Sequence, residues 1–209
     1  MVECGSDRSA DELRQGLEAE DPAVRAEVCQ QIGSSKDPQL FWLLARTLRS
    51  DTGLVRGTFL PIPVRAYAAQ ALGALGDSRA VDHLCRALTD RGDDRFWDAV
   101  QGEPFGDLVS YDDVNAMAAE ALGQIADLRS LPALSRAARR HPSPVVRASA
   151  ARALAMIRNR RPEADIPDEI LALARRSRRL DRERLETALA NLAMTDPDLA
   201  NILREENES

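Results

Sequence analysis

The chain has 209 residues, of which 44% are hydrophobic and 30% are charged, a composition typical of a globular protein with a substantial core. Its net charge of −6 argues against a general nucleic-acid-binding protein, and no apolar run approaches the roughly 20 residues of a membrane-spanning helix. Three widely spaced cysteines favour free thiols in a reducing compartment. The first ten residues lack the pattern of a secretory signal, so we expect a cytoplasmic protein without membrane contact.

A capping helix is predicted over residues 8–20, because Ser9 and Glu12 match the Ser-x-x-Glu capping box. Helical repeats are predicted over residues 21–178, and polar-faced capping helices over residues 179–209, since terminal repeats need a polar outer face to stay soluble. Sustained period-2 alternation is missing from the sequence. We therefore expect a single all-α domain that spans the chain.

One helix pattern recurs four times in the repeat region. The copies align on Val24, Val64, Val114 and Val146. Eight residues after each Val comes Ile or Leu, followed by Gly or Ala, and the apolar residues between them keep helical spacing. This spacing predicts one buried face for each helix. Arg follows Val in three copies, whereas Asn115 takes that place in the third.

A second helix follows each of these first helices after a short turn. Asp37-Pro38 is typical of an N-cap with Pro in the first turn, and Asp77 and Asp127 stand at the corresponding places. A weaker fourth copy runs through Ile170. Each unit is therefore predicted to be a helix pair.

These residues resemble the HEAT-repeat family, in particular the bacterial HEAT-like type named after phycobilisome lyases. The resemblance rests on Val-Arg near the start of the first helix, an Ala-rich middle with Leu-Gly, and the Gly-Asp-x-Arg-Ala-Val turn at Gly76–Val81. It implies an α-α superhelix, a HEAT-like solenoid of about four to six helix pairs whose second helices line the concave face. It also implies a structural Asp–Arg ladder that uses Arg25, Arg65 and Arg147.

Two insertions interrupt the repeat. The aligned Val positions are 40, 50 and 32 residues apart, so the first two spacings contain insertions, approximately at Asp51–Pro61 and Arg91–Tyr111. Both follow a second helix and are expected on the same edge of the solenoid. Five of the eight Phe, Trp and Tyr residues lie in them, namely Phe59, Phe96, Trp97, Phe105 and Tyr111.

Two interpretations of the insertion aromatics stay open. They either seal the edge of the core or form exposed anchors for a partner, since aromatic residues are enriched in binding hot spots. A second candidate surface is a row of arginines on the second helices, where aligned apolar positions bring equivalent side chains together. The row consists of Arg46, Arg86 and Arg136, with Arg49 and Arg139 one turn further on. It either binds carboxylates or phosphates or is a solvated face.

Signatures of catalysis are missing from the sequence. His83 and His141 have no partners at metal-ligand spacing, and there is no phosphate loop, nucleophile elbow or Cys pair. We therefore expect a non-enzymatic scaffold, without cofactor or metal, that binds a protein or peptide through the concave face and the aromatic insertions. A first alternative is a bilin lyase- or isomerase-like enzyme, as the family resemblance suggests. A second is nucleic-acid binding through an arginine patch near the C-terminal end, at Arg158–Arg161 and Arg175–Arg179.

Overall fold

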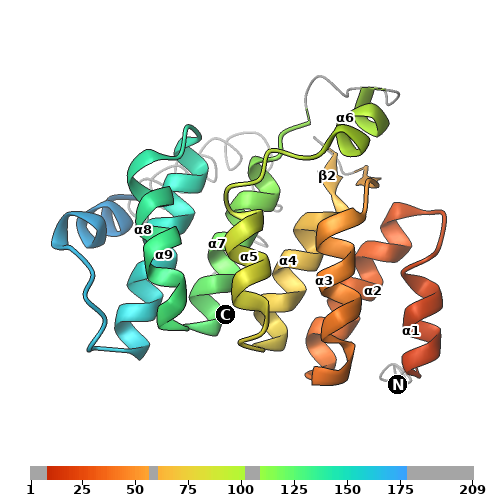
Figure 1. The fold of residues 1–209 in the computed structure, drawn as a ribbon, viewed down its shortest axis with the longest axis horizontal. Coiled ribbons are helices and arrows are strands. Elements are labelled where there is room, and N and C mark those ends of the chain that lie inside the picture. The colour runs from red at the N-terminus through yellow and green to blue at the C-terminus, as the bar shows by residue number, and fades with distance from the viewer. Residues whose placement is uncertain (1–8, 57–60, 102–108, 178–209) are drawn as a thin grey trace, which may run out of the picture.

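The computed structural model describes residues 9–56, 61–101 and 109–177, and over these residues the chain is a solenoid of stacked helix pairs (Figure 1). A short helix α1 (Ala10–Gly16) comes first, and Ser9 and Glu12 form the predicted capping box at its start. The four helix pairs then follow in chain order. They are α2 (Pro22–Ser35) with α3 (Phe41–Ser50), α4 (Val64–Leu75) with α5 (Ala80–Ala87), α7 (Asp112–Ile125) with α8 (Leu131–Arg140), and α9 (Pro144–Arg160) with a helix that begins at residue 168.

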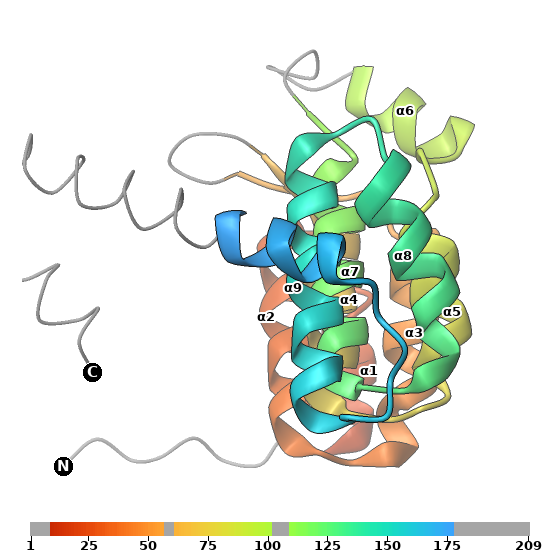
Figure 2. The same cartoon turned by 90° about the vertical axis from the view of Figure 1, so that its left-hand side faces the viewer.

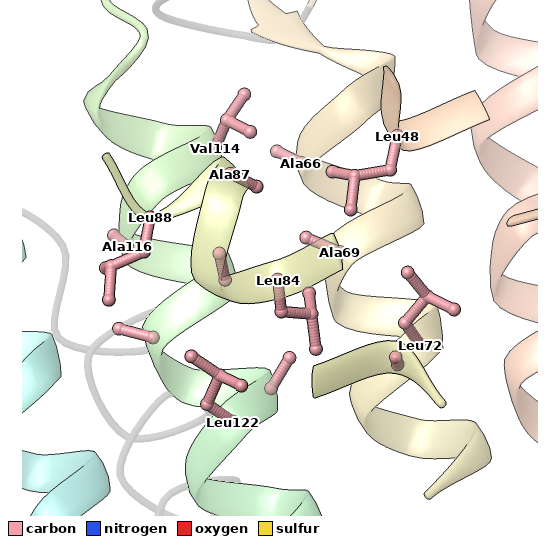
Figure 3. Packing of buried hydrophobic residues seen from close by; sticks show 14 of the residues in the cluster. Leu48, Ala66, Ala69, Leu72, Leu84, Ala87, Leu88, Val114, Ala116 and Leu122 are labelled. Atoms are coloured by element: carbon pink, nitrogen blue, oxygen red, sulfur yellow. The ribbon is translucent and has the colours of Figure 1, made fainter. Parts of the chain in front are cut away.

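The helices form two layers. Figure 2 shows the first helices α2, α4, α7 and α9 on one side and the second helices α3, α5 and α8 on the other. The core lies between the layers, where Leu and Ala side chains of α3, α4, α5 and α7 interdigitate (Figure 3). The predicted all-α solenoid is thereby confirmed. Small side chains dominate the core because the first helices approach one another closely.

A Gly–Ala contact repeats between successive first helices. The second member of each Leu-Gly or Ile-Gly pair faces an Ala of the next first helix, and a Cβ atom on the Gly would come within 2.6–2.9 Å of that alanine's Cα atom. The three contacts are Gly33 with Ala71, Gly73 with Ala121, and Gly123 with Ala153. Side chains larger than hydrogen would push the helices apart, so these glycines set the spacing of the repeats.

The turns between first and second helices are also linked from one repeat to the next. The short 3-10 helices Pro38–Leu40 and Leu128–Ser130 lead into α3 and α8. In the second turn, the carboxylate of Asp77 accepts hydrogen bonds from Arg79, and Arg79 also donates to the carbonyl oxygen of Pro38 at 2.7 Å. Asp127 and Arg129 repeat this arrangement. The Gly-Asp-x-Arg turn therefore holds successive repeats in register.

The two insertions emerge at one edge of the solenoid (Figure 1). The first contains β1 (Leu54–Val55), which forms a short antiparallel ladder with β2 (Ile62–Pro63), directly after the insertion. The absence of period-2 alternation did not predict this ladder, because each strand has only two residues. The second contains α6 (Asp94–Gln101), which stands beyond the ends of the stacked helices.

Candidate functional site

The second helices expose one row of basic side chains. In α3, α5 and α8 the leucines Leu44, Leu84 and Leu134 are fully buried. The residue two positions further on then points away from the core, because two helical residues span about 200°. All five arginines of the predicted row are exposed on this surface, which we call the second-helix face. They are Arg46, Arg49, Arg86, Arg136 and Arg139.

The arginines of the second-helix face differ in their partners. Arg46 forms an ion pair with Glu18 at 3.3 Å, and Arg139 forms one with Glu169 at 3.1 Å; all four side chains are half-exposed or more. Arg49, Arg86 and Arg136 have no ion pair with any residue in the described ranges. Pairing with a neighbouring carboxylate is thus seen at Arg46 and Arg139, and the other three arginines are exposed without it.

An exposed tryptophan lies on α3, the helix that also carries Arg49. Trp42 on α3 is 61% exposed, and its ring contacts that of His83 on α5 at a centroid distance of 6.1 Å. Phe41, buried beneath them, contacts both rings edge-on. We call Trp42, Arg49, His83 and Arg86 the aromatic–arginine cluster. It joins two adjacent helix pairs through side chains that are about 40 residues apart in the chain.

The environment of His83 lowers its pKa. Partial burial lowers the pKa of His83, and the positive charges of Arg86 and Arg49 lower this pKa further. The imidazole is therefore neutral at pH 7 and can donate through one ring nitrogen and accept through the other.

Sequence reasoning missed this cluster. It did not single out Trp42, and it gave His83 no role because His83 has no partners at metal-ligand spacing. A usable signal was present: Trp42 lies two residues before the core position Leu44, a register that predicts exposure. An exposed Trp on an otherwise polar face is an unusual feature.

A polar hollow of about 480 Å³ adjoins the second-helix face. It lies at the N-terminal end of the solenoid, and Arg46 forms part of its wall together with Glu18, Thr47 and Ser50. A smaller, apolar hollow of about 190 Å³ lies on the opposite layer between α4 and α7. Only the first is within the roughly 300–1,000 Å³ typical of pockets for organic ligands of drug size.

The insertion aromatics that the structure describes face inward. Phe96 is fully buried, Tyr111 is 5% exposed, and Trp97 is half-buried with its Nε1–H bonded to the carbonyl oxygen of Arg91 at 2.8 Å. The hypothesis that these residues are exposed anchors is thus corrected for Phe96 and Tyr111, which seal the edge of the core. Phe59 and Phe105 lie outside the described residues.

The physical reason for this burial is Arg65, whose side chain is 1% exposed. Its guanidinium donates to the carbonyl oxygen of Asp51 at 2.5 Å, to the Tyr111 hydroxyl at 3.0 Å and to Oδ1 of Asp93 at 3.0 Å. It also lies over the Phe96 ring, 5.3 Å from the centroid. Burial disfavours its charge, but the bonds to Tyr111 and Asp93 outweigh this and raise the pKa of Arg65. The second insertion therefore folds back to satisfy a buried cation.

The related arginines of the first helices are structural too. Arg25 forms an ion pair with Asp51 at 2.8 Å and donates to the carbonyl oxygens of residues 19 and 20. Arg147 likewise donates to the carbonyl oxygens of His141 and residue 142. Asn115, which replaces Arg in the third copy, donates to the carbonyl oxygens of Ala87 and Asp90 at the end of α5. These positions tie the connections to the helices.

Part of the C-terminal arginine patch, the run Arg158–Arg161, is engaged as well. Arg158 and Arg160 donate to the carbonyl oxygens of Ala164 and Gln124, and Arg161 lies 4.0 Å from Glu163. Arg178 and Arg179 fall outside the described residues. These contacts favour a structural patch over an interface with nucleic acid.

The described cysteines are poor nucleophiles. Burial, reinforced by the charge of Asp51, raises the pKa of the Cys29 thiol to about 12, and burial also raises the pKa of the half-buried Cys85. Over residues 9–56, 61–101 and 109–177, no group of three or more His, Cys, Asp and Glu residues has the arrangement of a metal site. No helix in the same ranges is long and apolar enough to cross a membrane.

Comparisons with known proteins agree with the repeat architecture. The family model of HEAT repeats matches residues 109–193, and the model of the PBS lyase HEAT-like repeat matches residues 64–90. The chain belongs to the HEAT-repeat family, with repeats of the bacterial PBS-lyase type. No curated protein matches the chain.

One solved structure that resembles the chain is that of the complex of CpcE and CpcF of phycocyanin lyase from Nostoc sp. PCC7120. The two share 20% identity with a TM-score of 0.47, over 76% of this chain and 68% of that chain.

The expectation of a non-enzymatic protein-interaction scaffold is corrected by these comparisons. The finding that overturns it is the match of residues 64–90 to the PBS lyase HEAT-like repeat, which favours the alternative of a bilin lyase-like enzyme. The scaffold hypothesis rested on missing catalytic motifs, and short local motifs do not capture a site assembled from successive repeats.

Proposed function

We propose that the protein is a bilin lyase- or isomerase-type enzyme, which holds a linear tetrapyrrole on its second-helix face. The observation that carries the proposal is the match of residues 64–90 to the PBS lyase HEAT-like repeat. This segment comprises α4 and α5 and supplies two members of the aromatic–arginine cluster, His83 and Arg86.

The chemistry of the face supports this proposal. Bilins are conjugated, nearly flat chains of pyrrole rings that carry propionate carboxylates. An exposed indole can stack on such a π-system, and unpaired guanidiniums match carboxylates in charge and geometry. His83, neutral at pH 7 because burial and the two arginines lower its pKa, can accept or donate a proton at the pyrrole rings.

The open position of the cluster suits transfer of the chromophore to a second protein. Cys29 is buried and Cys85 is half-buried, and the pKa of each thiol is raised, so neither offers a thiolate for attachment. Within the described residues the chain thus offers no acceptor thiol, and the partner implied by the proposal is a protein that supplies one. A ligand bound on an exposed face stays accessible to that thiol.

Co-expression with an enzyme system that makes a bilin tests the proposal. We expect the purified protein to carry visible bilin absorbance at close to one chromophore per chain, and to release it or change its spectrum when thiol acceptors are added. An unrelated protein of similar charge, purified from the same cells, is the control. Colourless protein that also leaves the spectrum of added bilin unchanged would refute the proposed function.

A further inference from the structure

The aromatic–arginine cluster presents an apolar ring to solvent on a pair of helices that also expose two arginines. Trp42 is the largest of the exposed hydrophobic side chains in the described part of the chain and is 61% exposed. Its position is defined by edge-on contacts with two rings. The distance between ring centroids is 4.8 Å to Phe41 and 6.1 Å to His83. The indole is therefore held by two rings while most of its surface remains available.

The cations of the cluster are also available. Arg49 and Arg86 are exposed and have no ion pair with any described residue. Arg86 lies one helical turn after His83 on α5, and Arg49 lies two turns after Trp42 on α3, so each is on the same side of its helix as its ring. The positive charges of both lower the pKa of His83. Asp82 is the one acidic group whose charge acts on His83 in the opposite sense. Exposed guanidiniums attract an anion by their charge and match a carboxylate in hydrogen-bond geometry.

We propose that Trp42, Arg49 and Arg86 form the binding site for a planar, conjugated dicarboxylate. Trp42 stacks on the π-system, and each arginine binds one carboxylate. The inference rests on the proposed function in taking a bilin as this ligand, with its two propionates at Arg49 and Arg86. His83 is a positioning residue that holds the indole ring edge-on from the neighbouring repeat.

The next repeat lacks this combination and provides a matched control. Aligned on Leu84 and Leu134, the helix α8 carries Pro132 at the position equivalent to Trp42 and Ala133 at the position equivalent to His83. Arg136 is exposed, like Arg86, and also has no ion pair within the described residues, but its repeat has no aromatic–histidine pair at the equivalent positions. If free arginines alone bound the ligand, Arg136 would contribute as much as Arg86.

The experiment titrates the purified full-length chain with biliverdin and with biliverdin dimethyl ester, which has the same π-system without charged carboxylates. Binding is followed by the visible absorbance and induced circular dichroism of the ligand. The variants are Trp42→Ala and the double variant Arg49→Gln/Arg86→Gln, with Arg136→Gln and Leu128→Ala as controls for a free arginine and an exposed apolar residue. Thermal melts confirm that all variants fold, as expected for exposed positions.

We expect Trp42→Ala to weaken the binding of both ligands about 10-fold or more, because stacking on one aromatic ring contributes about 5- to 150-fold in affinity. The double arginine variant should weaken biliverdin binding about 10- to 100-fold and leave ester binding within about twofold. The controls should bind both ligands within about twofold of the wild type.

The outcomes separate the two proposals. If the wild type binds biliverdin and neither Trp42→Ala nor the double variant weakens this binding, the proposed site is overturned. The proposed function then still stands. If the wild type does not bind biliverdin, mesoporphyrin, a cyclic tetrapyrrole dicarboxylate, is titrated next. Mesoporphyrin binding that depends on Trp42 supports the site and refutes the bilin function, whereas failure to bind either ligand overturns both.

Discussion

Replacement of Arg65 by Ala tests how the second insertion is held. The side chain is 1% exposed and is the largest of the fully buried side chains in the described residues. Its removal breaks the hydrogen bonds to the Asp51 carbonyl oxygen, the Tyr111 hydroxyl and the Asp93 carboxylate. It also removes the cation that lies over the Phe96 ring. Two of the three acceptors are inside the protein, so water does not replace the lost bonds without rearrangement.

The expected loss in the free energy of unfolding is about 3–5 kcal/mol, as for removal of one partner from a buried charged network. This is a large share of the roughly 5–15 kcal/mol that stabilises a typical domain. Asp93→Asn is the matched control, because that side chain is 42% exposed. Its ion pair with Arg65 is screened by water, so the loss should stay near about 1 kcal/mol.

Urea denaturation followed by circular dichroism gives both values, and limited proteolysis reports where the chain opens. We expect Arg65→Ala to make peptide bonds between Arg91 and Tyr111 susceptible to cleavage before the rest of the chain unfolds. Arg65→Lys should recover only part of the stability, since an ammonium group cannot reproduce the three-way contact of the guanidinium. Equal unfolding free energies for Arg65→Ala and Asp93→Asn would refute the account of a buried cation that organises the insertion.

Two further predictions concern the repeat spacing and the candidate site. Gly73→Val should lower the free energy of unfolding by about 2 kcal/mol in urea denaturation. The reason is that the added Cβ would come within 2.6 Å of the Cα of Ala121, and this overpacking outweighs the gain in helix propensity. An unchanged denaturation midpoint would contradict the close contact. Arg86→Gln should raise the pKa of His83 part of the way to its ordinary value of 6.5, since burial remains the larger cause of the lowering, and an NMR titration of the imidazole measures this. Because the folded protein disfavours the charged imidazole, its stability should decline as the pH falls from 6.5 through the folded-state pKa of His83. His83→Gln should lessen that decline. A rise in stability over this range would contradict the lowered pKa of His83.

The helix pairs and the arginine row could be predicted from the sequence because both depend on local periodicity. Val64, Ala68, Leu72 and their equivalents recur at helical spacing, and this spacing alone determines which face of each helix is buried. The same register predicts that Arg46 is exposed, as observed. The capping box at Ser9 was predictable for the same reason, since its two bonds join residues three positions apart.

The sequence by itself therefore determined the repeat, its helices and the exposed register of the second-helix face. The tertiary structure decided which of the aromatic residues are available to a ligand. Phe96 and Tyr111, which stood out in the sequence, are buried because the guanidinium of Arg65 needs polar and aromatic partners that only the folded insertion supplies. Trp42 and His83 drew no attention, since they belong to different repeats and meet only when α3 and α5 stack. Contacts of this kind depend on how closely the helices approach, a distance set by side chains elsewhere in the core, and periodicity carries no information about it.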